Sequence, residues 1–232
     1  GIVVQSIAQH KDIVSCMALS EVGDILVSGS KDTTVMVWNV GRDGELFINT
    51  TPKHILYGHD DEVTCVAVNA DLDIVVSGSR DGTCIIHTLR HGRYTRTITP
   101  PDGGCLRWVG ITGDGVIVTY SLHDLMLHAF NINGRHLASL DTGERLYAFT
   151  FSPDGQYLVV GGDRAQVCII TIPHFQLVHR LPAADSTIRS LYITPEQQHV
   201  LIGTLTGNIM IYALNANYLR KRFLKRLAHL GL

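Results

Sequence analysis

A short phrase occurs twice in this chain with the same internal spacing. Residues 28–38 read Ser-Gly-Ser-Lys-Asp-Thr-Thr-Val-Met-Val-Trp, and residues 77–87 read Ser-Gly-Ser-Arg-Asp-Gly-Thr-Cys-Ile-Ile-His. A His-x-x-x-Val element precedes each copy, beginning at His10 and at His59. Self-similarity with a period of roughly 40 to 50 residues indicates that the chain repeats one small structural unit. Such a chain buries its apolar faces between neighbouring units.

Three weaker copies follow, each ending in a run where large apolar residues alternate with other residues. This alternation is the pattern of a half-buried β-strand. Turn-forming segments such as Ser152-Pro153-Asp154-Gly155 separate the runs. Repeated short strands with Gly-His, Ser-Gly-Ser, Asp and Trp at set places are typical of WD-repeat β-propeller blades. We therefore predict an all-β WD-repeat propeller over residues 1–214, with five visible blades that end near Trp38, His87, Phe130, Ile170 and Tyr212.

The chain begins in the middle of a repeat. Residues 2–8 are similar to the last strand of an earlier blade. WD-repeat propellers most often have seven blades, although a closed ring of five is possible. We expect this chain to be the C-terminal part of a seven-bladed ring, with about two blades and further domains upstream.

Polar residues inside the first two blades can satisfy one another. A buried Trp N–H and a buried His both need partners, and an unmade hydrogen bond costs roughly 1–3 kcal/mol. WD-repeat proteins link such residues from Trp through Ser and His to Asp. Repetition of the set favours a structural relay over a Ser-His-Asp catalytic site. The predicted relay residues are His10, Ser28, Asp32, Trp38, His59, Ser77 and Asp81.

The relay weakens along the chain. The second blade has His87 in the place of Trp38, and the third keeps only Asp124. The fourth and fifth blades have Arg164 and Thr206 at the Asp position.

Composition excludes several classes of function. The net charge of −2 argues against a dedicated nucleic-acid binder. The five Cys form no Cys-x-x-Cys pair, which favours a reducing compartment. The twelve His lack the spacing of metal ligands, and no apolar stretch is long enough to cross a membrane. We expect no catalytic residue, no metal and no cofactor.

Unusual residues at WD-repeat positions indicate a particular family of WD-repeat propellers. His87-Thr88 stands where Trp-Asp is usual, and Phe130-Asn131-Ile132-Asn133-Gly134-Arg135 ends the next blade. This order resembles the C-terminal propeller of BEACH-domain proteins of the neurobeachin type, over roughly residues 9–213. The resemblance implies a cytoplasmic scaffold, peripherally associated with endomembranes, that acts in vesicle trafficking, membrane-protein sorting and, in some members, autophagy. It also implies upstream PH-like and BEACH domains, protein partners and, through the wider family, kinases.

Propellers usually bind partners on the face that carries the loops between strands d and a and between strands b and c. Charges on such loops can also be ordinary solvated residues with no partner to bind. The candidate partner-binding residues are Lys11, Lys31, Asp60, Asp61, Glu62, Arg80, His123 and Arg164.

Residues 215–232 form a basic tail. At 100° per residue, apolar residues such as Leu219, Phe223 and Leu227 share one face of a helix. A basic amphipathic helix can lie on an anionic membrane, bind a partner or dock on the propeller, and all three remain open besides disorder. The candidate tail residues are Lys221, Arg222, Lys225 and Arg226.

Three functions compete. A non-catalytic interaction module of a BEACH-type scaffold is the first. A substrate receptor of a ubiquitin ligase is the second, but such receptors have Arg two places after the Asp of Trp-Asp, and here Arg42 comes one place late. An enzyme is the third, and it would need converging carboxylates, a metal cluster or an activated nucleophile, which the sequence does not show.

Overall fold

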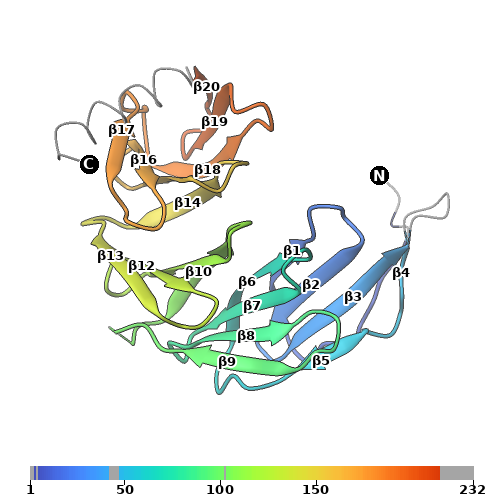
Figure 1. Ribbon diagram of the computed structural model, residues 1–232. Helices are drawn as coiled ribbons and strands as arrows, with labels where there is room; N and C mark the ends of the chain where they lie inside the picture. Colours follow the sequence, from blue (N-terminus) through green and yellow to red (C-terminus); the bar gives the residue numbers. More distant parts are fainter. Residues whose placement is uncertain (1–2, 4, 42–46, 102, 215–232) are drawn as a thin grey trace. The chain divides into compact units, whose positions relative to one another are not determined.

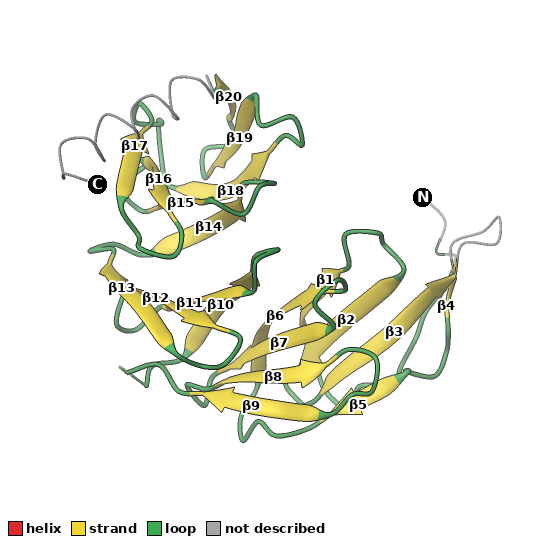
Figure 2. Ribbon diagram, viewed as in Figure 1, coloured by secondary structure: helices red, strands yellow, loops and turns green. Residues whose placement is uncertain are grey.

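The structure is a computed structural model that describes all residues except 1–2, 4, 42–46, 102 and 215–232. Every regular element in the described part of the chain is a β-strand (Figures 1 and 2). The strands form five antiparallel sheets, in which consecutive strands are neighbours except that β5 of the first sheet pairs with β3. The all-β propeller-type organisation predicted from the repeats is confirmed.

Three sheets come from the first part of the chain. The first consists of β1 (Val14–Leu19), β2 (Ile25–Ser30), β3 (Val35–Gly41), β4 (Phe47–Ile48) and β5 (His54–Leu56). The second consists of β6 (Val63–Asn69), β7 (Ile74–Ser79), β8 (Cys84–Thr88) and β9 (Tyr94–Ile98). The third consists of β10 (Leu106–Ile111), β11 (Val116–Ser121), β12 (Met126–Asn131) and β13 (His136–Asp141).

Two sheets follow. The fourth consists of β14 (Leu146–Phe151), β15 (Tyr157–Gly162), β16 (Val167–Thr171) and β17 (Leu177–Arg180). The fifth consists of β18 (Ile188–Ile193), β19 (His199–Thr204) and β20 (Ile209–Ala213). The chain divides into two compact units, Gly1–Leu137 and Ala138–Leu232, and the boundary falls within β13.

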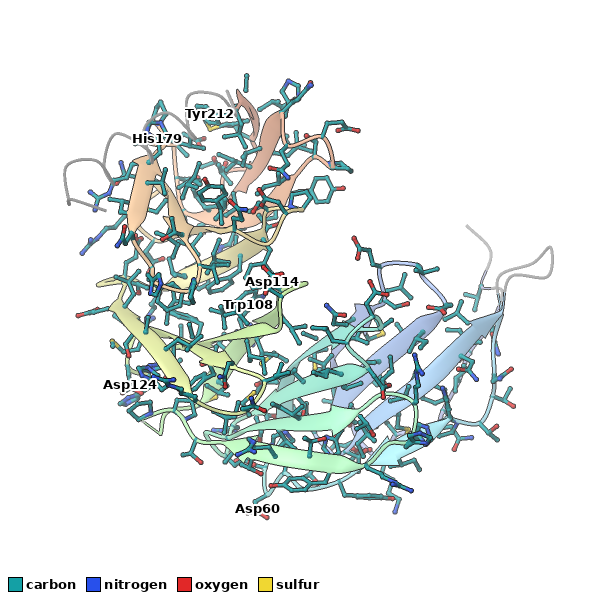
Figure 3. All side chains as sticks on the ribbon, viewed as in Figure 1. Asp60, Trp108, Asp114, Asp124, His179 and Tyr212 are labelled. Carbon is teal, nitrogen blue, oxygen red and sulfur yellow. The ribbon has the colours of Figure 1, made fainter. Side chains whose placement is uncertain are left out.

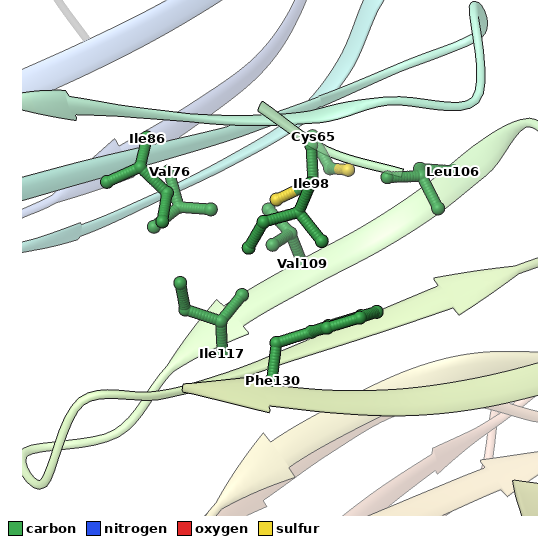
Figure 4. Close-up of a cluster of buried hydrophobic side chains, with 9 residues drawn as sticks. Cys65, Val76, Ile86, Ile98, Leu106, Val109, Ile117 and Phe130 are labelled. Atoms are coloured by element: carbon green, nitrogen blue, oxygen red, sulfur yellow. The ribbon is translucent and has the colours of Figure 1, made fainter. Parts of the chain in front are cut away.

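The core of the first unit lies between sheets. Val27, Val35 and Val37 of the first sheet pack with Val63 and Val75 of the second. A second cluster joins the second sheet to the third (Figure 4), and its buried members are Cys65, Val76, Cys84, Ile86, Ile98, Leu106, Val109, Ile117 and Phe130. The first sheet therefore buries an apolar face against the second, and the second buries one against the third, as repeat architecture requires.

The second unit is built in the same way. Val159, Val167 and Ile169 of the fourth sheet pack with Val200 and Ile202 of the fifth. These residues are almost fully buried, and they come from the central strands of the two sheets. The alternation seen in the sequence thus sorts large apolar residues into the space between two sheets.

The glycine of each Ser-Gly-Ser phrase lies where neighbouring sheets come closest. A Cβ atom on Gly29 would lie 2.6 Å from Val63 Cγ1 of the second sheet. One on Gly78 would lie 2.7 Å from Cys65 Sγ and 3.2 Å from Leu106 Cβ of the third sheet. Only the missing side chain lets the first strand of the next sheet approach, so the first and second sheets need glycine at this position.

Hydroxyl groups on the innermost strands also join the sheets of the first unit. Ser15 Oγ donates to the carbonyl oxygens of Gly29 and Val63, and Thr64 Oγ1 donates to those of Gly78 and Leu106. In the second unit, the same register positions hold Tyr147 and Arg189, and the Arg189 guanidinium lies 4.4 Å from the Tyr147 ring centroid. This register position thus links neighbouring sheets by hydroxyl hydrogen bonds in the first unit and by a cation–π contact in the second.

The first sheet exposes an apolar face. Met17 is 67% exposed, whereas its counterpart in the second sheet, Val66, is 9% exposed because the first sheet covers it. A pocket of about 370 Å³ opens on this face, with Met17, Leu26 and Trp38 among its lining residues. The fifth sheet likewise exposes Ile209 and Ile211. Both exposed faces carry large apolar residues of the kind that the other sheets bury.

Candidate functional site

The first sheet holds a continuous chain of hydrogen bonds. Trp38 Nε1 donates to Ser28 Oγ at 2.9 Å, and Ser28 Oγ lies 2.8 Å from His10 Nε2. His10 Nδ1 lies 2.9 Å from Asp32 Oδ2. With the proton on His10 Nδ1, Ser28 donates to the imidazole and the imidazole donates to the carboxylate. Strands β2 and β3 position Ser28 and Trp38, while the segment before β1 carries His10.

Asp32 also joins the segment before β1 to the turn after β2 by hydrogen bonds. Its carboxylate accepts hydrogen bonds from the Lys11 amide at 2.8 Å, the Thr34 amide at 2.9 Å and the Thr34 hydroxyl at 2.6 Å. Burial alone would raise the pKa of Asp32, but bonds led by those from Thr34 and the Lys11 amide outweigh it and lower the pKa to about 2. Sequence reasoning missed Thr34, although the Asp-x-Thr spacing recurs at Asp81 and Thr83.

The second sheet contains three of the four relay residues. His59 Nε2 lies 2.8 Å from Ser77 Oγ, and His59 Nδ1 lies 3.1 Å from Asp81 Oδ2. Asp81 accepts hydrogen bonds from the Asp60 amide at 3.0 Å and the Thr83 hydroxyl at 2.6 Å. Burial lowers the pKa of His59, although the neighbouring Asp81 opposes that shift. The ring is therefore neutral at neutral pH, as the relay requires.

His87 occupies the place of Trp38 but makes a different contact. Its Nε2 lies 3.1 Å from the Tyr57 carbonyl oxygen, and its ring lies edge-on to Tyr94. Its Nδ1 atom is buried and has no hydrogen-bond partner. Burial lowers the pKa of His87. The sequence predicted the position of His87 in the repeat, and the structure shows that this residue does not bond to Ser77.

The third sheet has lost the relay at its centre. Thr119 pairs with Val109 as Ser28 pairs with Met17, so it takes the serine position, and its hydroxyl is buried without a partner. Phe130 at the Trp position carries no polar hydrogen that could reach it. Asp124 lies in the turn between β11 and β12 (Figure 3) and accepts hydrogen bonds from Ser121 Oγ at 3.0 Å and His123 Nδ1 at 2.9 Å.

In the fourth and fifth sheets, hydrogen bonds still join the loop before the first strand to the loop after the second strand. The carboxylate that accepts them now lies in the loop before the first strand. In the fourth sheet, the Arg164 amide donates to Glu144 Oε2 at 2.6 Å. In the fifth, Thr206 Oγ1 and Asn208 Nδ2 donate to Asp185 Oδ2 at 2.6 and 2.5 Å. The acid here precedes the first strand, whereas Asp32 and Asp81 follow the second strand. The loops therefore remain joined although Arg164 and Thr206 replaced the acid.

A charged cluster joins the first two sheets on their loop face. Lys31 Nζ lies 3.5 Å from Glu62 Oε2, and Arg80 Nη1 lies 3.7 Å from Glu62 Oε1. The side chains of Lys31 and Arg80 are 46% and 62% exposed, and that of Glu62 is 22% exposed. Two cations that follow equivalent strands, β2 and β7, thus share one carboxylate from the loop before β6.

The structure places the other candidate residues of the first unit in the same classes of loop. Lys11 precedes β1, Asp60 and Asp61 precede β6, and His123 follows β11, and all four side chains are exposed. Arg164 belongs to the second unit, where its guanidinium donates to the Gly143 carbonyl at 2.9 Å. The four tail residues proposed to bind a membrane or a partner lie outside the described residues.

The described residues show two features that bear on metal binding and on cysteine chemistry. Those residues contain no group of three or more His, Cys, Asp or Glu that could hold a metal ion. Burial raises the pKa of the Cys84 thiol and raises that of Cys65 to about 12, so neither is a thiolate nucleophile at neutral pH. None of the described residues forms a helix able to span a membrane.

Comparisons with known proteins agree with this architecture. Residues 1–222 match the family described as the neurobeachin beta propeller domain. The match extends beyond residues 9–213, the range predicted from the motifs. In the solved β-propeller of Cps50 (Swd1) from Myceliophteria thermophila, 68% of the chain aligns with 90% of this one, with a TM-score of 0.73 and 16% identity. A chain of the mitotic checkpoint complex gives a TM-score of 0.75 at 18% identity, with 91% of this chain and 64% of that chain covered. At these identities the solved structures show the fold alone.

Curated relatives carry the family assignment further. BEACH domain-containing protein B of Arabidopsis thaliana is 41% identical over 95% of this chain, and BEACH domain-containing protein lvsE of Dictyostelium discoideum is 30% identical over 87%. The matched regions are 9% and 10% of those proteins, so this chain spans about a tenth of their length. The repeated relay, the antiparallel sheets and the match over residues 1–222 lead to one conclusion: the chain belongs to the neurobeachin β-propeller family, the WD-repeat propellers of BEACH-domain proteins.

Proposed function

We propose that this chain is the non-catalytic protein-binding module of a BEACH-type scaffold that acts in vesicle trafficking and membrane-protein sorting. The propeller family supports a protein-interaction module. One observation supports the position of the binding surface in the first unit, namely the cluster in which Lys31 and Arg80 of adjacent sheets share Glu62. In this proposal the protein is cytoplasmic and associates peripherally with endomembranes.

The relay holds this surface in place. Asp81 binds the Asp60 amide, Ser79 Oγ donates to the Asp61 carbonyl at 3.0 Å, and the Arg80 amide donates to the Glu62 carbonyl at 3.0 Å. The loop before β6 is thus bonded at three successive residues to the turn after β7. A rigid loop loses little conformational entropy when it binds, which favours a protein partner.

The charges on the surface determine which partner fits. Exposed charged groups at the rim of an interface steer association and reject wrong partners more than they add affinity. Lys31 and Arg80 are exposed and already oriented by Glu62, so a partner with an acidic group can approach both cations with little rearrangement. Proteins of trafficking and sorting complexes are the partners that this proposal names.

Affinity capture of the full-length protein from cells, with quantitative mass spectrometry, tests the proposal. The test variant is Lys31→Glu/Arg80→Glu. The matched control, Lys53→Glu/Arg93→Glu, makes the same change in charge on exposed residues of the first unit that precede β5 and β9, outside the proposed surface. We expect the test variant alone to lose a set of trafficking or sorting proteins by about tenfold. Equal capture by both variants, or loss of proteins unrelated to membranes, would contradict the proposal.

A further inference from the structure

The second sheet carries a run of cations along its outer edge. Residues 90–96 read Arg-His-Gly-Arg-Tyr-Thr-Arg, so three arginines and no acid lie within this short segment of a chain whose net charge is −2. The run covers the turn after β8 and the start of β9, which is the last strand in the order β6-β7-β8-β9 (Figure 1). All three arginines are exposed. The outer edge of this sheet is therefore basic, although the protein as a whole is slightly acidic.

Contacts with both neighbouring sheets hold this run in place. His54 Nε2 of β5 donates to the Arg90 carbonyl oxygen at 2.8 Å. A Cβ atom on Gly92 would lie 2.7 Å from His54 Cγ, so the turn after β8 packs directly on that imidazole. On the other side, a Cβ atom on Gly134 would lie 2.7 Å from Arg96 Cδ, so the aliphatic stem of Arg96 packs on the turn between β12 and β13. The basic run is thus fixed between the first and the third sheet.

The third sheet extends the basic surface. Arg135 directly follows Gly134, on which Arg96 packs, and its side chain is exposed. The outer-edge patch is defined here as Arg90, Arg93, Arg96 and Arg135. Among the described residues, Asp73 is the acid that pairs with this patch, and its Oδ1 lies 3.8 Å from Nε of Arg90, whose side chain is 73% exposed. Within that part of the chain the four cations share one carboxylate, which leaves positive charge for an external anion.

An aromatic ring is fixed among these cations. Tyr94 is 59% exposed, although its ring lies edge-on to His87 with the ring centroids 6.0 Å apart, and its hydroxyl lies 3.1 Å from Thr97 Oγ1. Tyrosine is enriched where a membrane meets water, because its ring is apolar and its hydroxyl stays hydrated. Clustered basic residues are attracted to the negative surface of a membrane. An exposed tyrosine between arginines therefore has the composition of a surface that lies on an anionic membrane.

We propose that the outer-edge patch binds the anionic headgroups of a membrane surface. The inference rests on the peripheral membrane association in the proposed function and assigns a surface to it. The cations follow β9 and continue onto the next sheet, so they suit a broad charged surface better than one small anion. Each basic residue near an anionic membrane contributes about 1 kcal/mol, or roughly fivefold in affinity. Salt weakens this attraction because it screens exposed charges.

Vesicle sedimentation with the purified full-length protein tests the proposal. Arg90→Gln/Arg96→Gln removes two positive charges and should weaken binding to phosphatidylcholine vesicles that contain phosphatidylserine by about 30-fold at low salt. The matched control, Arg107→Gln/Arg145→Gln, removes two exposed arginines that lie in β10 and directly before β14, outside the patch, and should bind as the unchanged protein does. Equal binding by the two variants, or binding of the unchanged protein that does not need phosphatidylserine, would overturn the proposal.

The vesicle test and the capture of protein partners can fail independently. Loss of the membrane surface would leave the capture of proteins through Lys31 and Arg80 unaffected, because those cations lie on the loop face. Arg93 belongs to the outer-edge patch, so the capture is made from detergent-solubilised cells, in which no membrane links the captured proteins.

Hydrogen exchange followed by mass spectrometry locates the contact in the full-length protein and needs no variant. With vesicles that contain phosphatidylserine, the amides of residues 93–97 should exchange at least about fivefold more slowly, because a bound membrane suppresses local opening of this edge. Soluble poly-glutamate at the same concentration of negative charge should protect these amides much less. Unchanged exchange with the vesicles would overturn the proposal. Equal or stronger protection by poly-glutamate would indicate an acidic protein partner and would overturn it as well.

Discussion

Removing the carboxylate of Asp32 tests whether the relay supports the first sheet. In Asp32→Ala, the His10 Nδ1–H loses its acceptor, and the two side chains of this pair are only 5% and 7% exposed. The Thr34 hydroxyl oxygen remains at 3.3 Å from His10 Nδ1 as a longer and weaker acceptor, and a buried donor without a good partner costs about 1–3 kcal/mol. The amides of Lys11 and Thr34 lose the same acceptor, but they lie close to the surface, where water can replace most of the bond. We therefore expect a total loss of about 2–4 kcal/mol in the free energy of unfolding.

The assay is urea denaturation at neutral pH, with the slope compared between variants so that a change in midpoint reports stability. Asp163→Ala is the matched control, because Asp163 is an exposed aspartate in the loop after β15. It should change the free energy of unfolding by less than about 0.5 kcal/mol. Equal losses in the two variants would refute the relay as a source of stability.

Three further predictions concern buried groups. Thr119→Val removes a buried hydroxyl that has no partner, so it should be neutral or stabilising, whereas Ser77→Ala should cost about 1–2 kcal/mol in the same denaturation assay. Gly29→Ala should lower the melting temperature clearly, because its Cβ would meet Val63, while Gly113→Ala, with no atom within 4 Å of the added Cβ, should not. The lowered pKa of His87 means that the unfolded chain binds more protons below about pH 6.5, so stability should fall as pH drops through that value, and His87→Phe should reduce the fall seen in melts between pH 7.5 and 5.5.

Spacing within one repeat explains why the relay residues could be grouped from the sequence. His10, Ser28 and Asp32 come from consecutive segments joined by short turns, so the sequence alone placed them near one another. Their hydrogen bonds in the structure have the order that the repeat implies. Thr34 was missed because a threonine two positions after an aspartate is common in turns, and only the bond to Asp32 reveals its role.

Contacts between repeats could not be predicted in this way. The Tyr57 carbonyl accepts the bond from His87 because the backbone passes beside the imidazole, and no side-chain pattern records the course of a backbone. The sharing of Glu62 by Lys31 and Arg80 depends on how closely the first two sheets stack. The unpaired hydroxyl of Thr119 likewise follows from the neighbours that enclose it.

The sequence by itself determined that this protein repeats a β-sheet unit and that it resembles BEACH-type propellers. These properties follow from strand alternation and from fixed hairpin lengths, which are local and therefore readable along the chain. The tertiary structure decided which relay residues find partners, why Gly29 must lack a side chain, and which charges meet on the loop face. Those outcomes depend on the distance between sheets, which non-local packing sets and no single repeat encodes.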